Sequence, residues 1–260
     1  RISVSGIRTG KPMSRKYKEH IVSLSGGIAS AVAADRVIGR HGDDVELWFA
    51  DTSWEDDDLY RFLDDLEVRW EREITRYKDG RTPPEVFEGE GIIGSNRFLS
   101  CTRKLKIQPF VKHIKDRLPC VVYLGLDWTE SHRLDGPRER YSKMGAKVDF
   151  PLLWEPRLMK RDYMKLVDGW GIEIPLMYRR GFSHNNCGGS CFRQGAYAWR
   201  KLQQSDPDRF QWMMEWEEGM QKVVGNHTIL NRGRSLRSLE GDGEQLSFEG
   251  IDDEGCFCSW

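Results

Sequence analysis

The 260-residue sequence lacks any apolar run long enough to cross a bilayer, which takes about 20 residues of helix. It also lacks a secretory signal, because its first residues, RISVSGIRTGKPMSRKYKEH, are polar and basic. No excess of one charge is present either, since 40 Lys and Arg face 41 Asp and Glu. We therefore expect a cytoplasmic protein without a membrane partner, and the overall charge indicates no particular ligand.

Two common nucleotide-binding signatures are also missing. The apolar run IVSLS (21–25) leads into SGGIAS, which has neither the Lys of G-x-x-x-x-G-K-[ST] nor the spacing of G-x-G-x-x-G. A strand, two glycines and a helix start still direct backbone N–H groups and a helix dipole toward an anion. The alternative interpretation is a tight strand–helix turn built from small residues.

Apolar and β-branched runs alternate with helical patterns along the chain. Strands are expected at 21–25, 45–52, 74–80 in part, 120–127 and 147–153. Helices are expected at 28–42, 58–73, 104–118 and 160–171, with two more inside 194–221 that separate near Pro207. Residues 81–100 are expected to be irregular, and the last forty residues to form a hairpin and a tail. This alternation predicts an α/β fold: a Rossmann-like, mostly parallel sheet with helices on both faces.

Three regions follow from the same pattern. They are an N-terminal arm (1–18), a nucleotide-binding α/β domain (19–180) and a C-terminal helical, Cys-containing extension (181–260). Polar residues follow three expected strands, in SGGIAS (25–30), ADTSWE (50–55) and GLDWTESHR (125–133). Because ligands of open α/β sheets bind at the carboxyl ends of the strands, we expect these segments to form one site.

Five segments, in this order, carry a family resemblance. They are SLSGGIAS (23–30), FADTSWEDDDLYRF (49–62), SCTRKLKIQPF (100–110), GLDWTESHR (125–133) and NNCGGSCFRQGAYAWRKLQQSDPDRF (185–210). The set resembles the PP-loop superfamily (adenine nucleotide alpha-hydrolase-like), in its phosphoadenosine phosphosulfate (PAPS) reductase-like family of bacterial and phage type. That family includes PAPS reductases, small subunits of ATP sulfurylase and DNA phosphorothioation enzymes.

The resemblance implies a nucleotide site, residue by residue. The nucleotide-binding residues that it implies are Ser23, Ser25, Gly26, Gly27, Ser30, Asp51, Thr52, Arg103, Lys104, Lys106, Ser131 and Arg133. Glu130 lies in the same segment as Ser131 and Arg133, and with Asp51 it is a candidate for catalysis and for binding Mg²⁺. Asp127 stands where relatives often carry Arg.

The reaction that the resemblance implies splits ATP into AMP and pyrophosphate, adenylylates a substrate and serves sulfur transfer. A sulfur-donor protein and DNA or RNA are possible partners, and basic residues at 11–18 and 133–143 suit a nucleic acid. The chain could also form a homo-oligomer. One alternative is a thiol-dependent PAPS or APS reductase that uses Cys256 or Cys258, although the end DEGCFCSW lacks the E-C-G-x-H-like tail. Another is a non-enzymatic subunit that binds nucleotide and nucleic acid.

The six cysteines divide into distinct groups. Cys187, Cys191, Cys256 and Cys258 form a C-x₃-C and a C-x-C pair, which could hold Zn²⁺ or a [4Fe-4S] cluster. Reactive thiols that relay sulfur, or cysteines without a ligand, are the alternatives. Cys101 is a candidate nucleophile beside basic residues, with packing as the favoured interpretation. Cys120 is expected in the core, as are the tryptophans at 199, 212 and 216.

Overall fold

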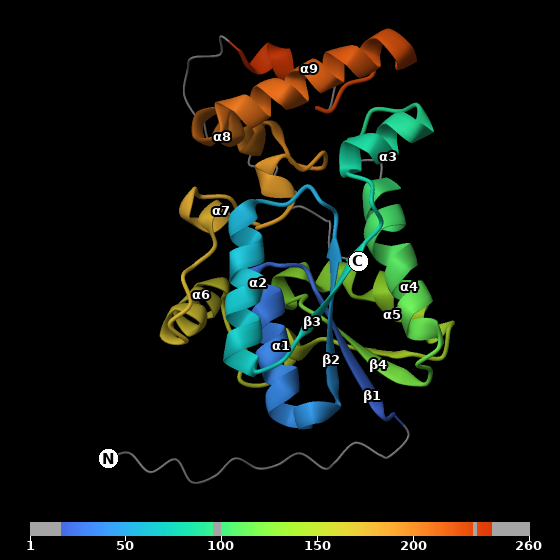
Figure 1. Cartoon of the computed structure of the whole chain (residues 1–260), viewed down its shortest axis with the longest axis vertical. Coiled ribbons are helices and arrows are strands. Elements are labelled where there is room, and N and C mark those ends of the chain that lie inside the picture. The colour runs from blue at the N-terminus through green and yellow to red at the C-terminus, as the bar shows by residue number, and fades with distance from the viewer. Residues whose placement is uncertain (1–16, 96–99, 231–232, 241–260) are drawn as a thin grey trace.

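The computed structural model describes residues 17–95, 100–230 and 233–240 (Figure 1). Its centre is a five-stranded sheet in the order β3-β2-β1-β4-β5, and every neighbouring pair is parallel. The strands are β1 (Glu19–Leu24), β2 (Val45–Asp51), β3 (Ile74–Lys78), β4 (Cys120–Leu124) and β5 (Lys147–Asp149). The expected α/β fold with a parallel sheet is therefore confirmed.

Both faces of the sheet are covered, as its continuous apolar strands require. On one face, Val22 of β1 packs with α1 (Ile28–His41), α2 (Asp57–Trp70) and α6 (Lys160–Gly169). On the other face, Ile21 packs with α4 (Gln108–Lys115) and α5 (Asp135–Ser142). Successive residues of β1 thus point to opposite apolar layers.

A third apolar cluster lies beside the sheet domain. It joins α3 (Pro83–Glu90) to α8 (Ala196–Ser205) and α9 (Pro207–Val224), which lie at the top of Figure 1. The short α7 (Leu176–Arg179) also contributes to it through Met177. Since this cluster combines α3 with the C-terminal helices, packing continues across the boundary that we expect near residue 180, and the domain limits stay a prediction.

The structure differs from the expected elements at several points. The helix α3 lies in a segment expected to be irregular, and Thr82 and Glu85 form a capping box at its start, with Pro83 in the first turn. The helix expected at 104–118 begins earlier, with a π-helical stretch at Thr102–Ile107. There the Gln108 N–H bonds to the Arg103 carbonyl, five residues back, just before Pro109.

The remaining differences concern strand lengths and the C-terminal segment. The strand expected at 120–127 ends at Leu124, and the one expected at 147–153 ends at Asp149 and continues as a 3₁₀ helix, Pro151–Leu153. Within the described part of 221–240 there is no strand, and a 3₁₀ helix, Leu236–Leu239, lies near its end. Residues 241–260, where the rest of the expected hairpin falls, lie outside the described residues. No described helix is long and apolar enough to span a bilayer.

Candidate functional site

The loop between β1 and α1 depends on two glycines. Gly26 has a φ of +76°, and a Cβ there would lie 2.7 Å from the Leu59 side chain. A Cβ on Gly27 would lie 2.8 Å from the hydroxyl oxygen of Tyr178. Both positions therefore exclude any side chain as the loop is packed here.

Ser30 closes this loop onto the first turn of α1. Its hydroxyl oxygen accepts the Ser25 N–H at 3.2 Å and the Ser25 hydroxyl at 3.1 Å, and it donates to the Gly27 carbonyl at 2.8 Å. The loop is thus held in shape by its own hydroxyls, with the start of α1 facing the carboxyl edge of the sheet. This is the arrangement that an anion-binding loop needs.

A cavity of about 370 Å³ opens at this loop. Its lining comes from the β1–α1 loop, from the segment that follows β4, from α6 and from residues 178–186. Gly125 lets the two strand ends approach, because a Cβ there would lie 2.8 Å from the Ser30 Cα. The cavity lies where β1 and β4 are neighbours although they are far apart in sequence, which is the switch point of the sheet.

Cations and carboxylates both line the cavity. Arg133 and Lys160 contribute positive charge, Asp127 and Glu130 contribute carboxylates, and His132 and His184 add imidazoles. Glu130 and Arg133 form an ion pair with each other. Lys160 donates to the carbonyl of Ser183 at 3.1 Å, so its ammonium is held at the cavity edge.

Asp127 is buried at the start of the 3₁₀ helix Trp128–Arg133. One of its oxygens accepts the Thr129 N–H at 2.8 Å, and the other faces the Tyr163 hydroxyl at 3.4 Å. Burial raises the pKa of Tyr163, and the Asp127 carboxylate raises it further. The tyrosine therefore remains a neutral hydrogen-bond donor beside a carboxylate.

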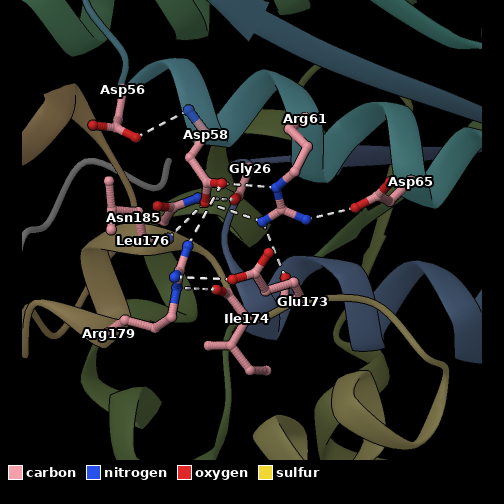
Figure 2. Close-up of polar contacts among 10 residues, drawn as sticks. All are labelled: Gly26, Asp56, Asp58, Arg61, Asp65, Glu173, Ile174, Leu176, Arg179 and Asn185. Atoms are coloured by element: carbon pink, nitrogen blue, oxygen red, sulfur yellow. Dashed lines mark hydrogen bonds and ion pairs between the residues drawn. The ribbon is translucent and has the colours of Figure 1, made fainter.

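Two side chains from the segment after α6 contact the glycine loop. Tyr178 accepts the Ile28 N–H at 3.2 Å, and Asn185 donates from its amide to the Gly26 carbonyl at 2.8 Å. Figure 2 shows how this segment is attached: Asp58 of α2 accepts the Leu176 N–H at 2.6 Å. Arg61 and Arg179 add contacts to residues 173 and 174.

The structure brings together five of the residues that the sequence nominates. Those that line the cavity are Ser25, Gly27, Ser30, Glu130 and Arg133. Gly26 belongs to the loop without lining the cavity, and Ser23 is fully buried in β1. Ser131 lies in the same 3₁₀ helix as Glu130 but is not part of the lining.

Asp51 and Thr52 lie at the end of β2 and do not line the cavity. One oxygen of Asp51 accepts the Ser53 N–H and the Tyr60 hydroxyl, both at 2.8 Å, and the other lies 3.0 Å from the Lys78 ammonium. Thr52 donates to Glu55 at 2.9 Å. These partners commit both side chains to the local structure of the β2 end.

The three basic residues before α4 also lie away from the cavity lining. Arg103 is exposed, Lys104 pairs with Glu90 at 2.6 Å, and the buried Lys106 lies 3.7 Å from the Glu55 carboxylate. Cys101 is buried in the third apolar cluster, which agrees with packing rather than with a nucleophile in this cavity.

Cys187 and Cys191 are both buried and pack together with Trp54. Cys256 and Cys258 lie outside the described residues. Among the residues described, no group of three or more His, Cys, Asp and Glu could hold a metal ion. The described pair alone does not fit Zn²⁺ or a [4Fe-4S] cluster, which take four ligands.

The predicted core positions are mostly confirmed. Cys120 is fully buried, and burial raises the pKa of its thiol to about 11. Trp199 and Trp216 are also buried. Trp212 differs, because it is 43% exposed and its ring centroid lies 4.9 Å from that of Trp54.

Sequence reasoning missed the part of the lining that comes from beyond residue 150. The missed residues are Lys160, Tyr163, Met164, Tyr178, Ser183, His184 and Asn186. They come from α6, α7 and the loop after α7, and they reach the cavity through tertiary packing. The only local signal was the pair Asn185–Asn186 at the start of the last family-like segment.

The loop and the ends of β1 and β4 lie in a segment that matches one protein-family model. Residues 19–142 match the family model described as the phosphoadenosine phosphosulfate reductase domain. Among solved structures, the chain is similar to a PAPS reductase from Candida auris in a phosphate complex, with a TM-score of 0.47 and 16% identity. That match covers 64% of this chain and 81% of the other. No curated protein sequence matches. The bacterial or phage type stays a prediction, and the segment that matches the PAPS reductase domain, residues 19–142, contains the glycine loop together with Glu130 and Arg133.

Proposed function

We propose that the chain is an enzyme that binds an adenine nucleotide in this cavity, with the phosphates against the loop Ser25–Ser30. The match of residues 19–142 to the PAPS reductase domain supports the nucleotide. The cavity volume, about 370 Å³, is in the range of small-ligand pockets. The loop and the start of α1 offer backbone donors, and Arg133 and Lys160 offer positive charge.

We propose ATP, as its magnesium complex, in preference to PAPS. The observation that carries this choice is the presence of Asp127 and Glu130 in the same cavity as the two cations. PAPS is a multiply charged anion, which these carboxylates would repel. ATP brings Mg²⁺ with it, and carboxylate oxygens are ligands that this ion accepts. Asp127 is also the position where the family resemblance leads us to expect Arg.

The proposed reaction adenylylates an oxygen of the acceptor substrate. That oxygen attacks the α-phosphorus, the bond to the bridging oxygen breaks, and pyrophosphate leaves with the electron pair. A sulfur nucleophile then displaces AMP from the activated acceptor, in line with the expected sulfur transfer. Donors at the loop and the cations Arg133 and Lys160 stabilise the negative charge on pyrophosphate, while the cavity holds the α-phosphate in line.

A thiol-dependent PAPS reductase is the competing activity. It requires a cysteine at the nucleotide: no described cysteine lines the 370 Å³ cavity, and the candidates Cys256 and Cys258 lie outside the described residues. Cys191 lines only a smaller neighbouring cavity of about 30 Å³. The sulfur-donor protein, a DNA or RNA acceptor and a homo-oligomer stay predictions.

The test is calorimetric titration of the protein with ATP plus Mg²⁺ and, separately, with PAPS. We expect binding of ATP in preference to PAPS, and loss of that binding in Ser30→Ala, because three hydrogen bonds of the loop depend on this hydroxyl. Ser142→Ala, at an exposed site in α5, is the matched control. A preference for PAPS would favour the reductase, and binding of neither would refute the nucleotide site.

A further inference from the structure

Tyr178 lies outside the segment that matches the family, yet its hydroxyl meets the start of α1. We propose that Tyr178 is a residue of the site that contacts phosphate. Its hydroxyl accepts a hydrogen bond from the start of α1 and donates one to the bound anion. This inference rests on the proposed function, because it assigns a residue to the same nucleotide cavity. Tyr178 lines that cavity together with Gly27 and Ile28.

The geometry at Ile28 is the first step. The free N–H groups at a helix start are the usual donors to a bound phosphate. Here the Ile28 N–H donates to the Tyr178 oxygen at 3.2 Å, so this donor is already engaged. The phenolic oxygen acts as the acceptor of that bond, and its own proton remains available to donate.

The second step concerns this phenolic proton. Within the described residues, no hydrogen bond from the Tyr178 hydroxyl to a protein acceptor is found, although the side chain lines the cavity. Burial raises the pKa of Tyr178 to about 12, so the proton is present at neutral pH. A hydroxyl that accepts one hydrogen bond becomes a stronger donor in the next, which favours a negatively charged acceptor.

The third step is that Tyr178 is held rigidly in this position. Its oxygen would lie 2.8 Å from a Cβ on Gly27, so its approach depends on glycine at that position. The chain on its N-terminal side is tied to α2 through Asp58 and Leu176 (Figure 2). On its C-terminal side, Asn185 holds the Gly26 carbonyl.

Asn185 has a related consequence for the loop. In a trans peptide the carbonyl and the following N–H point in opposite directions. By bonding to the Gly26 carbonyl at 2.8 Å, Asn185 directs the Gly27 N–H away from itself. Residues 174–186 therefore fix the orientation of the Gly26–Gly27 peptide and also place the Tyr178 hydroxyl beside the Ile28 N–H.

The opposing interpretation is that Tyr178 blocks the helix start. In that case, removal of the hydroxyl would free the Ile28 N–H and strengthen the binding of anions. Tyr178→Phe separates the two interpretations, because it keeps the ring and removes only the oxygen. Tyr77→Phe is the matched control, since Tyr77 lies on β3, is 38% exposed and is not part of the cavity.

The experiment is calorimetric titration of wild type, Tyr178→Phe and Tyr77→Phe with inorganic pyrophosphate, ATP plus Mg²⁺, and adenosine. We expect Tyr178→Phe to bind pyrophosphate and ATP about tenfold more weakly, the usual effect of one hydrogen bond to a charged group. Adenosine affinity should be unchanged, and Tyr77→Phe should match wild type for all three ligands.

Three outcomes would overturn the inference. Unchanged affinity of Tyr178→Phe for pyrophosphate would show that the hydroxyl does not touch the anion, and tighter binding would show that it blocks the site. An equal loss for adenosine and pyrophosphate would show a packing role. If wild type binds neither ATP nor pyrophosphate, the proposed function itself fails. If wild type and Tyr178→Phe bind pyrophosphate equally well, only the inference about Tyr178 fails.

Discussion

Asp58 in the first turn of α2 connects the sheet domain to the segment that carries Tyr178 and Asn185 (Figure 2). Its carboxylate accepts the Leu176 N–H at 2.6 Å, pairs with Arg61 at 2.7 Å and lies 3.8 Å from Arg179. We predict that Asp58→Ala lowers both the free energy of unfolding and the affinity for pyrophosphate, since the loop partners lose their anchor.

The size of the stability effect follows from these contacts. A hydrogen bond between a carboxylate and a backbone N–H contributes about 1.5–3 kcal/mol. The ion pairs with two partly exposed arginines contribute about 0.5 kcal/mol each, and a carboxylate in the first helical turn a similar amount. We therefore expect a loss of about 3 kcal/mol in the free energy of unfolding.

The contribution should depend on pH in a defined direction. The Arg61 guanidinium beside Asp58 holds the pKa of this carboxyl below its ordinary value, and the Leu176 N–H lowers it further against the effect of burial. A lowered pKa stabilises the fold above the unfolded value of about 3.9, and this stabilisation is lost as the pH falls through the folded pKa. The difference between wild type and Asp58→Ala should therefore shrink below about pH 4.

The assay is urea unfolding at pH 7, combined with hydrogen exchange of residues 173–186 and titration with pyrophosphate. Asp65→Ala is the control, because Asp65 pairs with the same Arg61 from the same helix and is itself 41% exposed. We expect faster exchange of 173–186 only in Asp58→Ala. Equal destabilisation by both substitutions, or a destabilised Asp58→Ala with unchanged exchange in 173–186, would refute the anchoring argument.

Three further predictions concern the loop, the opposite end of the sheet and the C-terminal helix. Gly27→Asp should abolish pyrophosphate binding in calorimetry, because its Cβ would lie 2.8 Å from the Tyr178 oxygen and its carboxylate would repel the anion; wild-type affinity would contradict the site. Burial lowers the pKa of His41 to about 4. Below about pH 6.5 this imidazole therefore binds a proton in the unfolded chain but not in the folded protein. Solvent screening at this partly exposed imidazole reduces the effect, so between pH 7 and pH 5 the free energy of unfolding should fall by about 1 kcal/mol more in wild type than in His41→Asn, and equal losses in urea titrations of both proteins would contradict this assignment. Glu217 accepts the N–H groups of Ile229 and Leu236 at 2.7 and 2.6 Å. Glu217→Ala should therefore lower the free energy of unfolding in urea by about 2–4 kcal/mol. An effect no larger than that of Glu218→Ala would contradict this prediction.

The parts of the fold that depend on local pattern could be predicted from the sequence. The run IVSLS became β1, and the helix that follows its glycines became α1, since each pattern has one strong periodicity. The helix α3 was not predicted because the glycines at 89, 91 and 94 indicate irregular structure, although the sequence T-P-P-E (82–85) stands at the start of the helix. That start is a capping signal, and it decided the local structure.

The candidate site was only partly predictable, because strand order is not a local property. The C-terminal ends of β1 and β4 meet at the cavity, while β2 lies on the other side of β1. Asp51 and Thr52 at the β2 end are therefore near the loop in the sheet without lining the cavity. Tyr178 reaches the loop through contacts such as Asp58–Leu176, which join residues 118 positions apart.

The two sources of the cavity lining suggest how general binding and specificity are divided. The matched segment 19–142 supplies the loop, Glu130 and Arg133, which suit any nucleotide phosphate. The segment beyond it supplies Lys160, Tyr163, Tyr178 and His184, side chains that differ in charge, size and hydrogen bonding. These groups line the same cavity as the loop, so an acceptor that reached the proposed nucleotide would contact them. We therefore predict that substitutions of Tyr163 or His184 change which acceptor the proposed reaction uses and largely retain pyrophosphate binding, whereas substitutions of Lys160 or Tyr178 also weaken that binding.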